Sequence, residues 1–165
     1  MQSDKFTALV RNAIGAAQSA ALAANHQKLT AEHVLAALLK DDNMTVKMLL
    51  AKAGADSASL SALLKAGLDK FPQVTGSGAG QLQLDADLAR ILAAVEAEAK
   101  ARHDQFVAVD LLLLGMTKST GSVGKILKKA GVEPAPLGAA IDEMRKGRTA
   151  DSDGAEDSYD ALSRY

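Results

Sequence analysis

An internal repeat with a spacing of 78 residues constrains the fold of this chain more than any other feature of the sequence. The stretch LTAEHVLAALL at 29–39 returns as VAVDLLLLGM at 107–116, with apolar residues at matching positions. The similarity continues from LLAKAGAD at 49–56 to ILKKAGVE at 126–133, where the spacing shortens to 77 residues. Because both copies carry apolar residues at helical spacing, the pattern predicts two copies of one helical unit.

The composition favours closely packed helices over a β-sheet. Apolar residues make up 48% of the chain, but aromatic residues make up only 3%. Ala, Leu, Val, Ile and Met must therefore form most of the core, and the 165 residues suffice for one domain with a tail. A net charge of −1 gives no strong field toward nucleic acid or a membrane surface, and the absence of cysteine excludes disulfides and thiolate metal sites.

The predicted fold is all-α, with two pseudo-twofold-related four-helix repeats at about 1–75 and 81–147. Residues 71–80, FPQVTGSGAG, contain a proline and three glycines and are expected to link the repeats. Gly54 and Gly131 are expected to end a helix in each copy. The expected helices cover about 3–24, with Ser3 or Asp4 as the N-cap, and then 30–40, 45–53, 57–70, 85–101, 108–117, 120–130 and 134–146.

The composition changes after Gly147. Residues 148–165 are polar and acidic and carry few apolar side chains. We therefore expect residues 1–147 to form the domain and 148–165 to form a flexible acidic linker that packs little of its surface. No apolar run is long enough to span a bilayer, and the N-terminus lacks the pattern of a signal peptide, so the expected compartment is the cytoplasm.

No motif in the chain carries visible catalytic chemistry. GSVGKI at 121–126 resembles a phosphate-binding loop, but Ser119 replaces its first glycine and Ile126 replaces the magnesium-binding Ser or Thr. His26, His33 and His103 are the only histidines, and none has the i, i+4 partner of a helical zinc motif. We therefore expect no catalytic residues, no metal site and no cofactor in this chain.

What remains is a surface for binding. Two helical units related by a pseudo-twofold axis leave a seam between them, and such junctions often form binding clefts. The residues alone support a binding module and a purely structural domain about equally.

The order and spacing of these motifs resemble a known family. The doubled pattern LTAEHVLAALL … LLAKAG and FVAVDLLLLGM … ILKKAG is similar to the Clp N-terminal domain, a tandem repeat of two four-helix units. The linker FPQVTGSG and the ending GAEDSYDALSRY resemble the disaggregating ClpB branch of that family, in which a similar segment leads into an AAA+ ATPase module. The resemblance covers essentially the whole chain.

The resemblance implies a role in protein disaggregation during heat stress. Such a domain binds exposed apolar segments of unfolded or aggregated proteins and passes them to a homohexameric AAA+ chaperone, which works with the Hsp70 (DnaK) system. ATP and Mg would belong to the ATPase modules of the parent chain. The fragment itself is expected to be monomeric, to lack enzymatic activity, and to bind neither ATP, nucleic acid nor membrane.

The resemblance also implies four substrate-binding residues, which are Thr7, Asp104, Asp110 and Leu111. The three polar residues are expected to form a polar margin of the seam between the two units, with Leu111 on its apolar side. Asp110→Ala is then expected to leave the fold intact, because a first-turn charge contributes only about 0.3–1 kcal/mol. Ala94 and Glu98 occupy positions where some relatives carry groove-forming leucines, so the groove is expected to differ in depth.

Two other functions remain open at this stage. Domains of the ClpA and ClpC type bind folded adaptor proteins for a protease, and a stand-alone helical regulator would end near Tyr165. The genomic reading frame would separate these possibilities, because continuation into an ATPase module favours a fragment of a chaperone.

Overall fold

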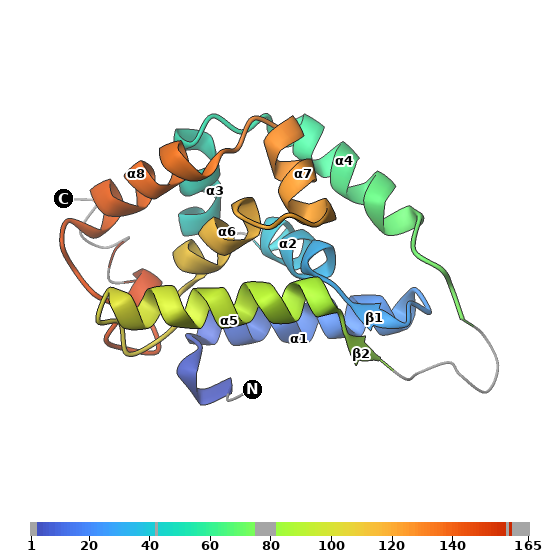
Figure 1. Ribbon diagram of the computed structural model, residues 1–165, viewed down its shortest axis with the longest axis horizontal. Coiled ribbons are helices and arrows are strands. Elements are labelled where there is room, and N and C mark those ends of the chain that lie inside the picture. The colour runs from blue at the N-terminus through green and yellow to red at the C-terminus, as the bar shows by residue number, and fades with distance from the viewer. Residues whose placement is uncertain (1–2, 42, 75–81, 158, 160–165) are drawn as a thin grey trace.

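The computed structural model describes residues 3–41, 43–74, 82–157 and 159, and these form a helical domain (Figure 1). The all-α prediction is confirmed. The elements are η1 (Ser3–Lys5), α1 (Ala8–Ala23), β1 (Lys28–Leu29), α2 (Ala31–Lys40), α3 (Met44–Lys52), α4 (Ser57–Asp69), β2 (Gln83–Leu84), α5 (Ala86–Ala101), α6 (Val109–Thr117), α7 (Ser122–Lys129) and α8 (Pro134–Arg145).

The predicted repeat is present in the helices. The first residues of α1, α2 and α3 lie 78 positions before those of α5, α6 and α7, and α4 begins 77 positions before α8. Gly54 and Gly131 follow the third helix of each copy with φ angles of 90° and 92°, as expected for glycine at this position.

The pseudo-twofold relation is visible in two short pairings of extended backbone. Leu29 in β1 pairs with Leu84 in parallel β2, and Phe6 forms a bridge with Val107. Because Val107 is the repeat counterpart of Leu29, and Leu84 that of Phe6, each pairing is the symmetry mate of the other. In each pairing, an extended residue just before a helix of one repeat therefore pairs with an extended residue just before a helix of the other repeat.

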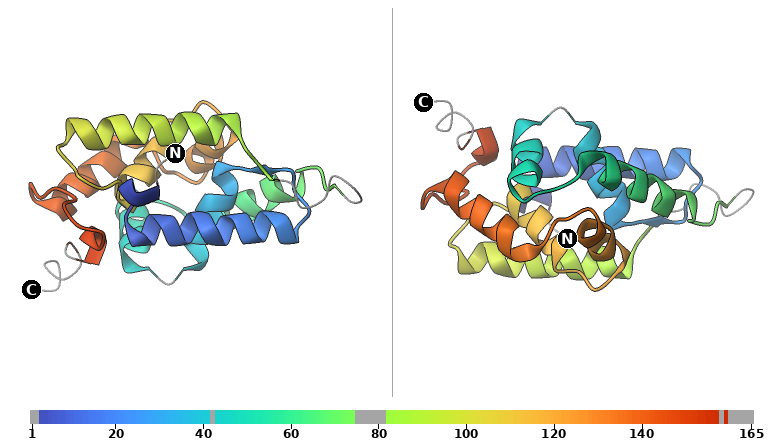
Figure 2. Two further views of the ribbon diagram at one scale, coloured as in Figure 1. Left: turned by 90° about the horizontal axis from the view of Figure 1, so that it is seen from below. Right: turned by 90° about the horizontal axis from the view of Figure 1, so that it is seen from above.

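The helices of the two repeats also interleave. α3 packs against α8, and in the symmetry-related contact α7 packs against α4. Figures 1 and 2 show α1 and α5 running antiparallel along one side of the molecule, with α2 and α6 at its centre. The two repeats thus share one core, because each completes the packing of the other.

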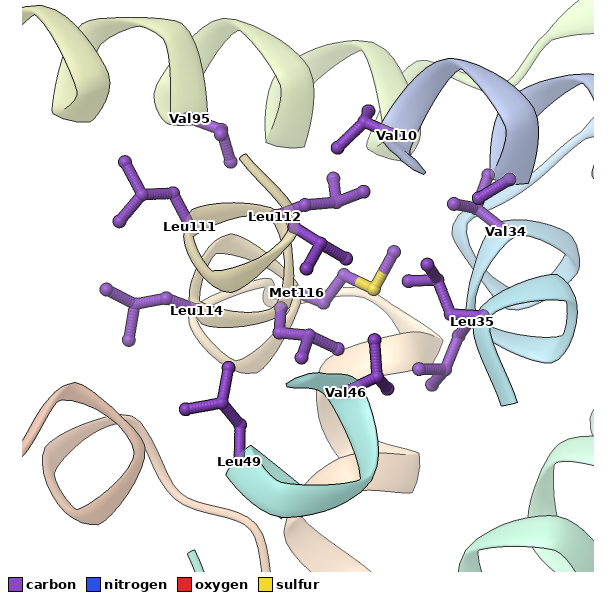
Figure 3. Packing of buried hydrophobic residues seen from close by; sticks show 14 of the residues in the cluster. Val10, Val34, Leu35, Val46, Leu49, Val95, Leu111, Leu112, Leu114 and Met116 are labelled. Carbon is purple, nitrogen blue, oxygen red and sulfur yellow. The ribbon is translucent and has the colours of Figure 1, made fainter. Parts of the chain in front are cut away.

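The centre of this core is α6, which is buried around almost its whole circumference (Figure 3). Leu112 and Met116 are completely buried, and Val34, Leu35, Val46 and Leu49 of the first repeat surround them. Aliphatic side chains supply this packing, as the low aromatic content predicts.

The first helix begins later than the sequence suggests. Ser3–Lys5 is a separate 3₁₀ turn, and Thr7 is the N-cap of α1, accepting a hydrogen bond from the Val10 N–H at 3.4 Å. The prediction of Ser3 or Asp4 as the cap is therefore wrong. Phe6, the residue before this cap, is held in an extended conformation by its bridge with Val107, so the helix does not start earlier.

The residues after α8 pack against the domain. We name residues 150–157 and 159 the exit segment; Ala150, Ala155, Glu156 and Tyr159 within it are each at most 3% exposed. The expectation that residues after 147 pack little surface is therefore wrong for these positions. The proposed linker character of 160–165, and that of 75–80 between the repeats, lies outside the described residues.

Candidate functional site

A groove of about 280 Å³ lies between α5 and α6. Ile91 and Val95 of α5, together with Leu111 and Leu114 of α6, form its apolar lining. These four side chains are almost fully buried, whereas Ala94 beside them is exposed. Ala94 and Glu98 both line this groove. The two positions at which some relatives carry leucines therefore belong to the groove itself.

Charged side chains of both signs border the apolar lining. Arg90 and Lys118 are exposed, and Glu98 forms a 3.0 Å ion pair with Arg102. Gly115 lets α6 approach α5 closely, because a Cβ there would overlap Val95 Cγ2. The groove therefore offers a small apolar contact surface with a polar border.

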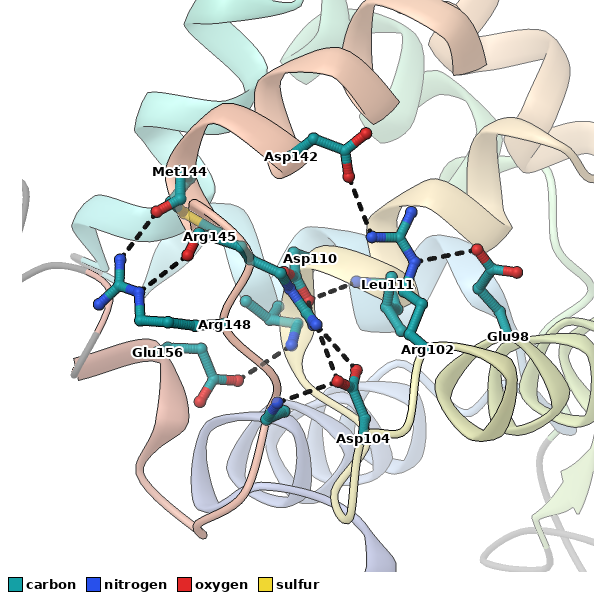
Figure 4. Close-up of polar contacts among 12 residues, drawn as sticks. Glu98, Arg102, Asp104, Asp110, Leu111, Asp142, Met144, Arg145, Arg148 and Glu156 are labelled. Atoms are coloured by element: carbon teal, nitrogen blue, oxygen red, sulfur yellow. Dashed lines mark hydrogen bonds and ion pairs between the residues drawn. The ribbon is translucent and has the colours of Figure 1, made fainter.

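Behind the groove, an interior ion-pair network joins α8, α6 and the turn before α6 (Figure 4). Arg145 of α8 donates to Asp110 Oδ2 at 2.6 Å and to Asp110 Oδ1 at 2.9 Å. Its third guanidinium nitrogen donates to both oxygens of Asp104 at 2.9 Å. Burial opposes the charge on Arg145, but these carboxylates outweigh it and raise the pKa of the guanidinium.

A second buried contact completes the start of α6. The N-cap position of α6 is Ala108, which has no side chain able to accept a hydrogen bond. Glu156 Oε2 of the exit segment accepts from the Val109 N–H at 2.9 Å and from the Thr7 hydroxyl at 2.6 Å. Burial raises the pKa of Glu156, although these two hydrogen bonds favour its ionised form.

The structure brings the four predicted site residues together around the first turn of α6, but it does not expose them. Thr7 and Asp110 are 0% exposed, Leu111 is 1% exposed, and the side chain of Asp104 is 0% exposed. Their polar atoms bind Glu156, Arg145 and backbone groups instead of forming an open margin. Only Leu111 of the four lines the groove, and substrate binding by these residues stays a prediction.

The sequence predicts only a small loss of stability for Asp110→Ala, and the assumption behind this prediction is wrong. The prediction treats Asp110 as a first-turn charge, whereas the carboxylate is buried and bound to Arg145. Sequence reasoning missed Arg145, Glu156 and Tyr159 altogether. Arg145 lies 35 residues after its partner Asp110, and Glu156 lies 149 residues after its partner Thr7. Contacts so distant along the chain leave no local pattern in the sequence.

The repeat relation produces a counterpart groove in the first repeat. This groove, of about 790 Å³, lies between α1, α2 and α4. Ala16 and Ala37 line it at the positions equivalent to Ala94 and Gly115, and His33 takes the place of Leu111. The two grooves thus share a position in the repeat but differ in lining.

His33 belongs to a buried polar cluster at the start of α2. The Thr30 N–H donates to His33 Nδ1 at 3.1 Å, so the ring proton resides on Nε2, which lies 2.8 Å from His26 Nδ1. Burial, and then the neighbouring His26, lower the pKa of His33 to about 4. Phe71 lies against both rings, with centroid distances of 5.5 Å.

The described part of the chain contains no group of three or more His, Cys, Asp or Glu residues arranged to hold a metal ion. His103 lies in a turn with φ of 66°, at the position where the first repeat has Asn25 with φ of 59°. His103 is therefore the repeat counterpart of Asn25, with the same left-handed backbone, and is not a counterpart of His26 or His33. None of the described helices is both long and apolar enough to cross a membrane.

Comparison with known proteins defines the class of protein. The sequence profile of the Clp repeat (R) N-terminal domain matches residues 5–151, and the chain belongs to this family. The N-terminal domain of Hsp104 from Candida albicans has the same fold, with a TM-score of 0.80, 22% identity, and coverage of 92% of this chain and 98% of that one. A ClpV N-domain solved in complex with a VipB peptide is also similar, with a TM-score of 0.69, 15% identity, and coverage of 90% and 91%.

Within the family, the chain is similar to the N-terminal part of ClpB. It is 42% identical to the chaperone protein ClpB of Rhizobium meliloti (strain 1021) over 166 residues. The alignment covers all of this chain and 19% of the relative, so the chain spans about a fifth of the length of that relative.

Proposed function

We propose that this chain is the substrate-engaging N-terminal domain of a ClpB-type, ATP-dependent protein disaggregase. It binds exposed apolar segments of unfolded or aggregated proteins and passes them to an AAA+ hexamer in the heat-stress response. The observation that carries the proposal is the apolar groove between α5 and α6, which is lined by Leu111 and bordered by charges of both signs. The similarity to ClpB supports this function over an adaptor-binding role of the ClpA or ClpC type.

The chemistry of the groove suits many different clients. Apolar burial is non-directional, so a lining of Ile, Val and Leu does not depend on one client sequence. A volume of about 280 Å³ accommodates only a few side chains, which favours weak contact. Dissociation constants between millimolar and micromolar correspond to about 4–8 kcal/mol, and a client held this weakly is readily released to a motor.

Leu111 contacts the client in this proposal, whereas Thr7, Asp104 and Asp110 hold the wall of the groove in position. The parent chain would form a homohexamer in the cytoplasm, bind ATP and Mg in its AAA+ modules, and work with the Hsp70 (DnaK) system. A ClpV N-domain, which shares this fold, has been solved with a bound peptide, and this supports peptide binding as a role for the domain.

A matched pair of substitutions on α5 tests the groove. Ala94 and Ala93 are both exposed neighbours on the helix, but only Ala94 lines the groove. A fluorescent unfolded peptide of Leu, Phe, Ser and Gly should bind Ala94→Lys about tenfold more weakly than the unmodified chain, since losing about 1.4 kcal/mol has this effect. Ala93→Lys should bind it normally. Equal binding by both variants, with unchanged melting curves, would locate the site elsewhere.

A further inference from the structure

The exit segment supplies the N-cap that α6 lacks. Glu156 Oε2 lies 2.9 Å from the Val109 backbone nitrogen and 2.6 Å from the Thr7 hydroxyl, and its side chain is buried. A carboxylate at a helix N-terminus satisfies an otherwise unpaired N–H and complements the helix dipole. The start of α6 therefore depends on a residue that lies 47 positions further along the chain.

Further contacts hold the exit segment against the interior ion-pair network. The Ala150 N–H donates to Asp104 Oδ1 at 2.9 Å, and the Ala150 carbonyl accepts from two backbone N–H groups of the turn before α6. The guanidinium carbons of Arg145 and Arg148 lie 5.3 and 5.2 Å from the centre of the Tyr159 ring. The segment thus contacts both Arg145, which holds Asp110, and Asp104, which binds the same guanidinium.

A third contact ties the segment to α1. Arg11 forms a bidentate ion pair with Asp153, with two distances of 3.0 Å, and the Ala8 N–H donates to the Asp153 carbonyl at 3.0 Å. The Arg11–Asp153 pair is exposed, so its contribution to stability is small. The buried contacts of Glu156 and Ala150 therefore dominate the docking.

The turn of α6 that binds the exit segment also forms the groove. Val109 and Asp110 face the segment and Arg145, while the next residue, Leu111, lines the groove. The Leu111 N–H donates to Asp110 Oδ1 at 2.8 Å, so the backbone of the groove wall is bonded directly to the network. If the exit segment undocks, the Val109 N–H and the Thr7 hydroxyl lose their acceptor, and the first turn of α6 is free to fray.

We propose that the exit segment and the α5–α6 groove are coupled, so that docking of the segment strengthens client binding and a bound client holds the segment docked. The proposal rests on the proposed function of the groove. Docking orders the first turn of α6, and a client that meets an ordered wall loses less conformational entropy on binding. Because coupling between two sites is reciprocal, the client must stabilise the docked segment by the same factor.

The coupling gives the segment a role beyond connecting two parts of a chain. An occupied domain holds the chain after Ala150 against its own surface, whereas an empty domain releases that chain more often. Glu156 is then a positioning residue for the groove, since it acts on the client only through the start of α6.

Hydrogen exchange on the full 165-residue chain tests the coupling from the segment side. A saturating amount of the Leu, Phe, Ser and Gly peptide should slow the exchange of the amides of residues 153–157 by about fivefold, within the usual range for coupled sites. At a peptide concentration that half-saturates the unmodified chain, the slowing of those amides should be several-fold smaller in Ala94→Lys, which binds the peptide about tenfold more weakly.

Substitutions in the exit segment test the coupling from the groove side. Glu156→Ala should weaken peptide binding by about fivefold and raise exchange in the segment, because it removes the cap. Glu156→Gln keeps a carbonyl acceptor and should restore most of the affinity. Asp157→Ala removes a carboxylate from the exposed neighbouring side chain and should bind the peptide normally.

The outcomes separate this proposal from the function of the groove. If the peptide binds the unmodified chain but leaves exchange in the segment unchanged, the coupling is refuted and the groove remains. Undiminished binding by Glu156→Ala, in a variant whose segment exchanges freely, refutes it equally. If no peptide binds the unmodified chain, the proposed function fails and the coupling fails with it.

Discussion

The two repeats begin their central helices in different ways. α2 starts at Thr30, whose hydroxyl accepts from the His33 N–H, while the His33 ring accepts from the Thr30 N–H. α6 starts at Ala108 and takes its cap from Glu156, beyond the end of the second repeat. One helix is capped by neighbours three residues apart, and its counterpart depends on a residue from another part of the fold.

The same contrast extends to the side chains around each start. The first repeat surrounds the start of α2 with aromatic and imidazole rings from His26, His33 and Phe71. The second repeat places charges there, with Arg145 between Asp104 and Asp110. At the repeat positions of these three charged residues, the first repeat has Leu68, His26 and Glu32.

Repeated helices are therefore not always stabilised by repeated contacts. The helices begin at matching positions, but the N-cap of α2 comes from residues three positions apart, whereas that of α6 comes from Glu156. Because remote contacts can be broken by moving one segment, the second repeat is the one whose central helix and groove can respond to the exit segment.

The largest expected effect comes from breaking the charged network. Asp110→Ala leaves the buried Arg145 with one carboxylate and should lower the free energy of unfolding by about 3–5 kcal/mol. Glu32→Ala, its counterpart in the first repeat, removes the acceptor of one Ser122 hydrogen bond and should cost only about 1 kcal/mol. Urea unfolding of both variants measures the difference, and equal losses would show that the network does not set the two repeats apart.

The imidazole cluster should make the stability of the first repeat depend on pH. His33 is buried with a pKa of about 4, against 6.5 for the unperturbed group. As the pH falls, His33 is therefore protonated in the unfolded chain before it is protonated in the folded one. The stability that neutral His33 contributes is present above pH 6.5 and is lost as the pH falls toward 4, by on the order of 3 kcal/mol.

His33→Leu introduces the residue that the second repeat has at the equivalent position, Leu111. The substitution removes the pH-dependent contribution of His33 to stability. The substitution should lower stability by a constant amount through the lost cap, and should flatten the pH profile between 6.5 and 4. Urea unfolding at a series of pH values checks the slope. Parallel profiles for both proteins would exclude His33 as the titrating group.

The smallest effect concerns the size of residues between paired helices. The second repeat places Gly115 against Val95, whereas the first has Ala37 and Ala17 at these positions. Gly115→Ala should cost about 1–3 kcal/mol through overpacking, although Ala favours a helix. Adding Val95→Ala should recover part of the overpacking cost.

A glycine with open space around it provides the control. No atom outside the local helix lies within 4 Å of a Cβ built at Gly15 of α1. Gly15→Ala should therefore raise stability by about 1 kcal/mol through helix propensity alone. Thermal melting of the variants decides whether packing or propensity dominates at each site, and a stabilising Gly115→Ala would contradict the close approach of α5 and α6.

The helices and their repetition can be read from local patterns in the sequence. Periodic apolar residues, the capping residues Thr30 and Asp85, and the glycines at 54 and 131 act within a few positions, so a reader of the sequence can find them. The same local signals place Ala94 and Glu98 on one helix and Leu111 on another. The resemblance to a known family then indicates that Leu111, Ala94 and Glu98 lie near a binding groove.

The interleaving of the repeats, and the contacts made by the polar residues of the second repeat, become visible only in the folded molecule. Thr7 and Asp110 look like ordinary first-turn residues until Glu156 and Arg145 reach them from distant parts of the chain. The acidic composition after Gly147 suggests a solvated linker, yet the partners that bury Ala150, Glu156 and Tyr159 are supplied by α1, α6 and α8. Burial depends on which elements meet in space, and local sequence patterns do not encode such meetings.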